Sequence, residues 1–112
     1  MIKVIFLLHR RDGISREQFL REWSGDQHKS IASKIPGLLK VVQNHPVSEP
    51  SDNEPPVDGI GELWFASPET MQATFDSTEW TAAIKDSERY VDFARSQSLI
   101  VKELEFFETS LA

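Results

Sequence analysis

Apolar residues recur along the chain with two different periods. Over residues 2–9 they occupy alternate positions from Ile2 to Leu8, and Ile5 and Leu7 make the opposite face apolar too. This pattern predicts a strand that is covered on both sides. The same reasoning predicts strands over residues 38–47, 57–66 and 99–107.

Helical spacing fills the two longer intervals between these strands. Ser15 and Gln18 form a capping-box signature, which predicts a helix over residues 16–33. Gly25 interrupts the apolar pattern of this helix. An interior glycine weakens a helix by roughly 1 kcal/mol, so Gly25 is the position at which the helix is expected to bend. Ser67, followed by a proline, caps a short helix, and Ser77 caps a further helical piece. The apolar stripe of that piece contains Trp80, Ala83, Ile84, Val91 and Ala94.

The order of elements, β-α-β-β-α-β, predicts a ferredoxin-like α+β fold with a four-stranded antiparallel sheet and helices on one face. A single domain over residues 1–112 accounts for the whole chain. The uncovered sheet face needs a partner, so we expect a homodimer whose sheets pack face to face as a barrel. The acidic, proline-rich stretch around residues 48–58 is expected to be an exposed loop, with a lid over a pocket as the alternative.

Composition excludes several classes of function. The net charge of −6 argues against nucleic acid and anionic membranes as partners. The chain has no cysteine, and its three histidines are scattered, so a metal site is not expected. No phosphate-binding loop or serine-nucleophile motif is present, so no cofactor is expected. No apolar run reaches the ~20 residues of a membrane helix, and a soluble, cytoplasmic protein is expected.

His28 is the strongest candidate for chemistry. Ile31, Ala32 and Ile35 follow it at helical spacing, so its imidazole shares an apolar stripe if the helix bends at Gly25. A histidine in an apolar pocket can act as a general acid or base near neutral pH. The alternative is a core histidine with satisfied hydrogen bonds.

Glu62 is the second candidate, because it shares a strand face with Ile60 and Trp64. A carboxylate there needs a partner, for which His28 or Arg10 is expected. The pair would either support proton transfer or form a salt bridge at the dimer interface. Five aromatic residues are expected either to line an aromatic-accepting pocket or to pack in the core and interface; they are Trp23, Trp64, Trp80, Phe75 and Tyr90. His45, which Pro46 follows, is a further candidate for substrate binding, and the alternative for it is a surface or loop position.

The segments G-I-S-R-E-Q-F-L-R-E-W, I-P-G-L-L-K-V-V-Q-N and G-I-G-E-L-W-F-A-S-P-E-T-M, in this order, resemble the EthD family of dimeric α+β barrel proteins. The resemblance implies a pocket between sheet and helices and gives His28 the place of the family's helix histidine. The family that the chain resembles includes methylmuconolactone isomerases and proteins linked to ether-degrading oxygenases. The isomerase-like members also use a tyrosine and a second histidine; here Val41 and Val42 stand in the strand, and His45 is only a loose counterpart.

The favoured hypothesis is a cofactor-independent enzyme of a catabolic or secondary-metabolic pathway. His28, assisted by Glu62, would transfer a proton on a compact, apolar carbonyl, lactone or phenolic substrate, as an isomerase or lyase does. One alternative is a non-catalytic, ligand-binding dimer associated with an oxygenase system. Another is a cofactor-free oxidoreductase in which deprotonation by His28 starts a reaction with oxygen.

Overall fold

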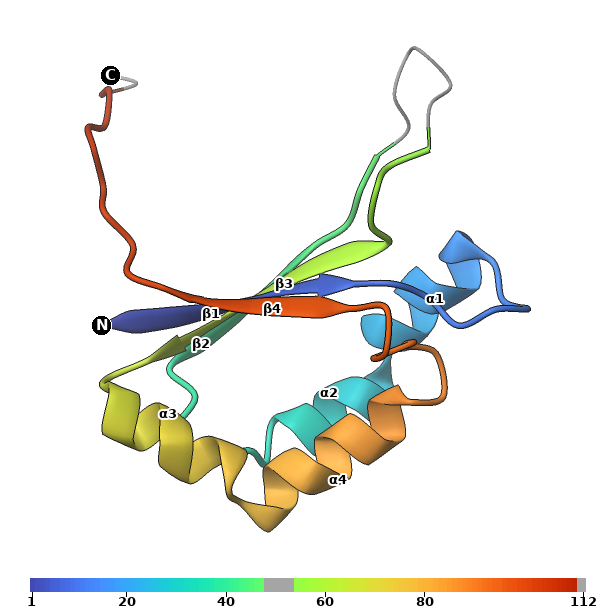
Figure 1. Ribbon diagram of the computed structural model, residues 1–112, viewed down its shortest axis with the longest axis horizontal. Coiled ribbons are helices and arrows are strands. Elements are labelled where there is room, and N and C mark those ends of the chain that lie inside the picture. Colours follow the sequence, from blue (N-terminus) through green and yellow to red (C-terminus); the bar gives the residue numbers. More distant parts are fainter. Residues whose placement is uncertain (48–53, 111–112) are drawn as a thin grey trace.

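The computed structural model describes residues 1–47 and 54–110. Its element order is β1 (Ile2–Leu8), α1 (Arg16–Trp23), α2 (Asp26–Ala32), β2 (Lys40–Asn44), β3 (Gly59–Phe65), α3 (Pro68–Phe75), α4 (Thr78–Ser87) and β4 (Gln97–Val101). The strands form one antiparallel sheet in the order β2-β3-β1-β4. The helices lie on one side of it (Figure 1). The predicted ferredoxin-like α+β fold is thus confirmed.

The helix boundaries follow the capping residues that the sequence predicts. Ser15, Ser67 and Ser77 each accept a hydrogen bond from the backbone N–H three residues later, at 3.1 Å in all three cases. The stretch 16–33 is two helices rather than one bent helix, because Gly25 becomes the N-cap of α2. A Cβ on Gly25 would lie 2.9 Å from the carbonyl oxygen of Arg21, so the tight junction favours glycine.

The strands are shorter than expected, and the largest shift of a strand end is at the C-terminal end of β4. It was predicted over residues 99–107, but it begins at Gln97 and ends at Val101. Val101 pairs with Lys3 of β1, next to the start of that strand, so residues after 101 have no neighbouring strand to bind. The last helical stripe also stops early, because α4 ends at Ser87 before Val91.

Two clusters of buried residues fill the space between the sheet and the helices. One cluster contains Leu8, Phe19, Trp23, Tyr90 and Val91. The other contains Val4, Leu63, Phe65 and Met71. Phe6 packs against both. No helix among the described residues is long and apolar enough to cross a membrane.

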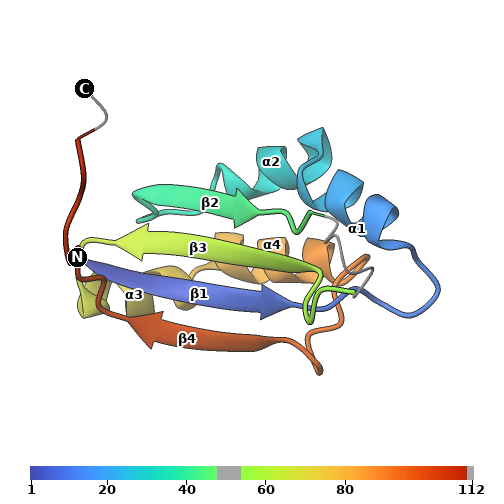
Figure 2. The same ribbon diagram turned by 90° about the horizontal axis from the view of Figure 1, so that it is seen from above.

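The side of the sheet turned away from the helices is called the outer face here. Seen from above in Figure 2, β2 and β4 are its two edges. It carries the alternate residues of β1 and β3 that do not face the helices, namely Lys3, Ile5, Leu7, Ile60, Glu62 and Trp64. The labelled helices all lie on the opposite side of the sheet from this face (Figure 1).

Candidate functional site

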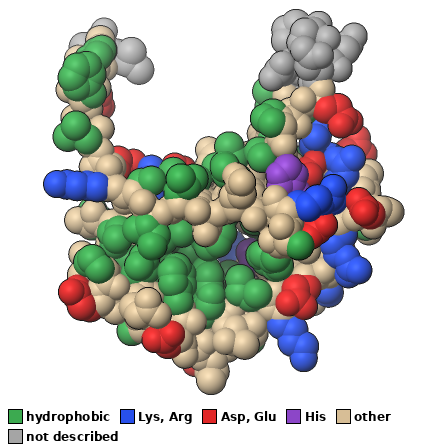
Figure 3. All heavy atoms as spheres, viewed as in Figure 1, with side chains coloured by type: hydrophobic (Ala, Val, Ile, Leu, Met, Phe, Trp, Pro, Cys, Tyr) green, Lys and Arg blue, Asp and Glu red, His purple; other side chains and the backbone are tan. Residues whose placement is uncertain are grey.

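A cavity of about 90 Å³ lies between the sheet and helices α2 and α4. Its walls are mostly apolar and include Phe6, Leu63, Trp80, Ile84 and Phe93. The space-filling view shows a hollow ringed by hydrophobic side chains, with a histidine at its bottom (Figure 3). Such a concave, apolar site with few polar groups is typical of small-molecule binding.

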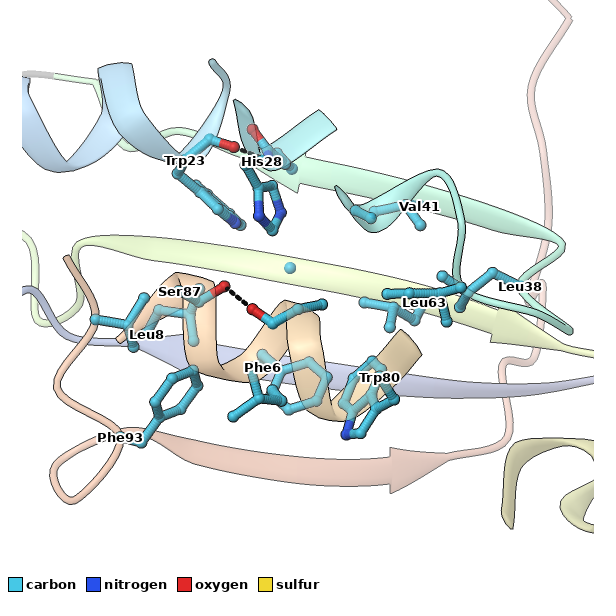
Figure 4. Close-up of a pocket in the computed structure, with 17 residues that line it drawn as sticks. Phe6, Leu8, Trp23, His28, Leu38, Val41, Leu63, Trp80, Ser87 and Phe93 are labelled. Atoms are coloured by element: carbon cyan, nitrogen blue, oxygen red, sulfur yellow. Dashed lines mark hydrogen bonds between the residues drawn. The ribbon is translucent and has the colours of Figure 1, made fainter. Parts of the chain in front are cut away.

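His28 is the histidine that lines this cavity. It lies on α2, and Ala32 and Ile35 of the same stripe line the cavity with it, as the helical spacing predicts. Its ring points into the space beside Trp23 (Figure 4). Its Nδ1 atom is buried and has no hydrogen-bond partner among the described residues.

The protein environment favours the neutral form of His28. Burial lowers its pKa most, and the nearby Arg89 lowers it further, while Asp86 acts in the opposite direction. The pKa therefore lies below the usual 6.5 of a histidine. At neutral pH the imidazole is uncharged and able to accept a proton.

Tyr90 lies directly behind His28, with the two ring centroids 6.2 Å apart and the rings perpendicular. The tyrosine is 1% exposed, and its hydroxyl has no hydrogen-bond partner among the described residues. Burial raises the pKa of Tyr90 to about 12, so the hydroxyl keeps its proton at neutral pH. Tyr90 adjoins the residues that line the cavity but is not one of them.

Trp23, Gln43 and His45 form a connected group at the β2 side of the cavity. The side chain of Gln43 donates to the carbonyl oxygen of Trp23 at 2.8 Å and lies 2.9 Å from Nε2 of His45. The exposed His45 ring stacks on Trp23 with centroids 5.3 Å apart. Trp23 and Gln43 line the cavity, whereas His45 supports them from outside. Sequence reasoning missed Gln43, although strand alternation places it on the same face as Val41.

Two aromatic candidates of the α3–α4 region lie at different depths. Trp80 lines the cavity and packs against Phe6 with ring centroids 6.0 Å apart. Phe75 is one layer behind, 4.7 Å from the Trp80 ring and 5.7 Å from that of Phe65. Phe75 therefore supports Trp80 and does not itself line the cavity.

Glu62 and Trp64 lie on the outer face, away from the cavity. The buried positions of β3 are Gly59, Gly61, Leu63 and Phe65, so the residues between them point to the other side. The Glu62 carboxylate accepts from Lys3 at 3.0 Å and from Asn44 at 3.3 Å. The hydrogen bond from Lys3 is the main reason that the pKa of Glu62 is lowered.

The expected pairing of Glu62 with His28 or Arg10 is therefore wrong. The sequence pattern grouped Glu62 with Trp64 correctly but could not decide which sheet face they occupy. Arg10 instead binds the buried Asp58 through its guanidinium and its backbone N–H, both at 2.8 Å. Arg16 donates to the same carboxylate at 3.1 Å.

The residues that line the cavity offer little to a metal ion. His28 is the one histidine among them, and within residues 1–47 and 54–110 no group of three or more histidine, aspartate or glutamate side chains could hold a metal. The polar side chains that line the cavity besides His28 are those of Gln43 and Ser87. The Ser87 hydroxyl donates to the carbonyl oxygen of Ala83 at 2.8 Å. Within this part of the chain, the arrangement can supply one base and a few hydrogen bonds in an apolar space.

Comparison with known proteins identifies relatives of this fold and sequence. The EthD domain model matches residues 11–94. The 4-carboxymethyl-4-methylbutenolide mutase of Pseudomonas reinekei is 34% identical over 83 residues, which span 69% of this chain and 76% of the mutase. Two solved structures are similar in fold. An ethyl tert-butyl ether D (EthD) family protein from Bacillus halodurans has a TM-score of 0.74 at 22% identity, covering 93% of this chain and 99% of that protein. A dimeric protein of unknown function with a ferredoxin-like fold from Bacteroides fragilis has a TM-score of 0.64 at 16% identity, covering 91% and 95%.

The match to the family model and the similarity to the mutase both support the family that the order of the sequence segments indicated. The matched region contains helices α1 and α2, with His28, and strand β3, whose Gly61 and Leu63 line the cavity. The chain belongs to the EthD family.

Proposed function

We propose that this protein is a cofactor-independent enzyme that binds a compact, uncharged, largely apolar molecule and transfers a proton on it with His28. The observation that carries this proposal is the neutral imidazole at the bottom of an apolar cavity. A general base of this kind accelerates proton transfer by about 10²–10⁴-fold. Relatedness to a mutase supports an enzyme over a purely structural protein.

The proposed reaction is an isomerisation with one base. His28 takes a proton from the carbon next to a carbonyl group, and the electron pair of that C–H bond moves into the conjugated system. The imidazolium that forms is unfavourable in an apolar cavity. It therefore returns the proton to another carbon of the same molecule, so atoms and electrons balance and no co-reactant is needed.

The cavity lining narrows the substrate class. None of the described lining residues is lysine, arginine, aspartate or glutamate, and burying an unpaired charge is costly. The name of the P. reinekei mutase gives a butenolide that carries a carboxymethyl group. We infer that this chain prefers a neutral lactone, ketone or phenol, held between Trp80 and Trp23 and oriented by Gln43.

Tyr90, Phe75 and His45 have supporting roles in this proposal. Tyr90 keeps the His28 ring in place by edge-on contact, and Phe75 and His45 do the same for Trp80 and Trp23. Glu62 and Trp64 take no part in the reaction, because they lie on the outer face. We assign that face to a homodimer in which two sheets pack together; the dimeric B. fragilis protein with the same fold supports this assignment.

A neutral lactone in D₂O tests the proposed proton transfer. With α-angelica lactone as the probe, we expect the wild-type protein to accelerate deuterium uptake and double-bond migration, followed by ¹H NMR. His28→Gln should lower the rate at least ~100-fold. His9→Gln, which changes a histidine outside the cavity, should keep the wild-type rate. A full rate in His28→Gln would contradict the proposal.

One observation favours a second candidate, a ligand carrier attached to an oxygenase system. Among the lining residues that the structure describes, His28 is the one side chain that titrates near neutral pH, so no second acid or base assists it. The same experiment separates the two functions. A carrier would bind the lactone and shift its resonances but would not exchange its protons.

A further inference from the structure

Proton abstraction by His28 creates a negative charge inside the cavity. When a base removes a proton from the carbon next to a carbonyl group, the charge develops on the carbonyl oxygen. An unpaired charge is costly in an apolar space, so this oxygen needs hydrogen-bond donors at the position it will occupy. Among the described lining residues, the side-chain N–H groups of Gln43, Trp23 and Trp80 are the candidates besides His28 itself.

The Gln43 amide has one orientation, which its two neighbours decide. The carbonyl oxygen of Trp23 lies 2.8 Å away and can only accept, so the amide nitrogen faces it. The amide oxygen therefore faces Nε2 of His45 at 2.9 Å, and that nitrogen must carry a hydrogen. The amide nitrogen has a second N–H, for which the described residues provide no acceptor. Within this part of the chain, Gln43 thus keeps one donor for a ligand in the cavity.

The Trp23 indole presents a second donor beside His28. Its nitrogen lies at the edge of the ring that is turned towards the His28 ring (Figure 4). A Cβ on Gly59 would meet Cζ3 of the indole at 2.6 Å, and one on Gly61 would meet Cζ2 at 3.4 Å. Because Cζ2 belongs to the nitrogen side of the indole and Gly61 lines the cavity, this side of the ring faces the cavity. No hydrogen bond joins the indole nitrogen to a described residue.

The other polar groups of the lining are less suited to hold the oxygen. The Ser87 hydroxyl donates its hydrogen to the carbonyl oxygen of Ala83, so it has none left for a ligand. The nitrogen of Trp80 lies on the side of its ring away from His28 (Figure 4). In a carbonyl compound only two bonds separate the oxygen from the acidic carbon, so the donors must lie close to the base. Trp23 meets this condition, and Gln43 is bonded to it.

We propose that the N–H groups of Gln43 and Trp23 together bind the carbonyl oxygen of the substrate and stabilise the negative charge that forms on it. This inference rests on the proposed proton transfer by His28. The proton moves from carbon to the imidazole, the electron pair of the C–H bond moves towards the oxygen, and the two donors hold that oxygen until the proton returns. The substrate class narrows to lactones and ketones, whose carbonyl oxygen can accept two hydrogen bonds.

A pair of ligands tests the two donors without any turnover. Cyclopentanone and methylenecyclopentane have nearly the same shape, but only the ketone has an oxygen that accepts hydrogen bonds. In ¹⁵N-labelled protein, cyclopentanone should move the signals of the Gln43 side-chain amide and the Trp23 indole N–H downfield, and methylenecyclopentane should not. The Trp80 indole should respond to contact with either ligand. Equal shifts of the two donors with both ligands, or no shift with the ketone, would overturn the inference.

Deuterium uptake by α-angelica lactone separates failure of the donors from failure of the base. Gln43→Leu should lower kcat at least ~100-fold and change KM less than roughly threefold, because the donor acts mainly in the transition state. Asn44→Leu removes an amide at the next position of β2, outside the cavity, and should keep the wild-type rate.

The three variants give different answers for the two proposals. A wild-type kcat in Gln43→Leu, together with an inactive His28→Gln, would overturn the role of the donors and leave the proposed base standing. A wild-type protein that exchanges no protons would overturn the proposed function and, with it, the charge stabilisation inferred here. The ligand experiment uses the wild-type protein, so it does not depend on the folding of any variant.

Discussion

At the scale of single residues, the environment of His28 links its chemistry to stability. The same burial that keeps its imidazole neutral makes protonation of the folded protein unfavourable. In the unfolded chain the pKa returns to its usual 6.5. As the pH falls below this value, the unfolded state binds the proton first, and the free energy of unfolding decreases.

This linkage predicts a His28-dependent loss of stability between about pH 7 and pH 5. Urea unfolding of wild type and His28→Gln at several pH values in this window measures it. The wild type should lose stability as the pH falls, and the variant should lose less. Carboxylates with lowered pKa values, such as Asp58 and Glu62, destabilise the fold only at lower pH and do not interfere. Parallel curves for the two proteins would show that His28 is not buried as described.

The fate of the predicted residues shows what a sequence can reveal at this scale. His28, Ala32 and Ile35 share a wall of the cavity as helical spacing indicates. Glu62 was misplaced because alternation in a strand defines two faces without naming the buried one. The two glycines of β3 were the missing signal, since Gly59 and Gly61 mark the side that α1 approaches closely.

At the scale of elements, that close approach gives a sharp prediction. A Cβ on Gly59 would lie 2.6 Å from the buried Trp23 ring, whereas one on Gly61 would lie 3.4 Å from it. Gly59→Ala should therefore lower the free energy of unfolding by about 1–3 kcal/mol through overpacking. Gly61→Ala, in the same strand, is the matched control and should change it by less than about 0.5 kcal/mol. Similar losses for both, measured by chemical denaturation, would mean that α1 does not pack on β3 at Gly59.

The ends of helices and strands could be predicted where nearby residues in the sequence determine them. They could not be predicted where pairing with another strand determines them. Serine caps fixed the starts of α1, α3 and α4, because each cap acts within three residues. The end of β4 depends on where β1 begins, and no local pattern around Val101 records this. Residues 48–53 of the expected exposed loop or lid lie outside the described residues. At the end of that stretch the expectation is wrong, because Asp58 is buried and binds Arg10.

At the scale of the whole molecule, the sheet separates two functions. Its helix side holds the apolar cavity with His28, and its outer face holds the Lys3–Glu62 pair and Trp64. The order of elements was sufficient to predict this architecture, whereas the face on which Glu62 and Trp64 lie required the structure.

The central claim is that a neutral small molecule binds beside His28 and not on the outer face. Titration of isotope-labelled protein with α-angelica lactone, followed by NMR, tests it most directly, because tryptophan indoles report on both faces. We expect saturable shifts of the His28 ring and the Trp80 indole, with the Trp64 indole unchanged. Shifts at Trp64 in place of Trp80, or no saturable shift at His28, would contradict it.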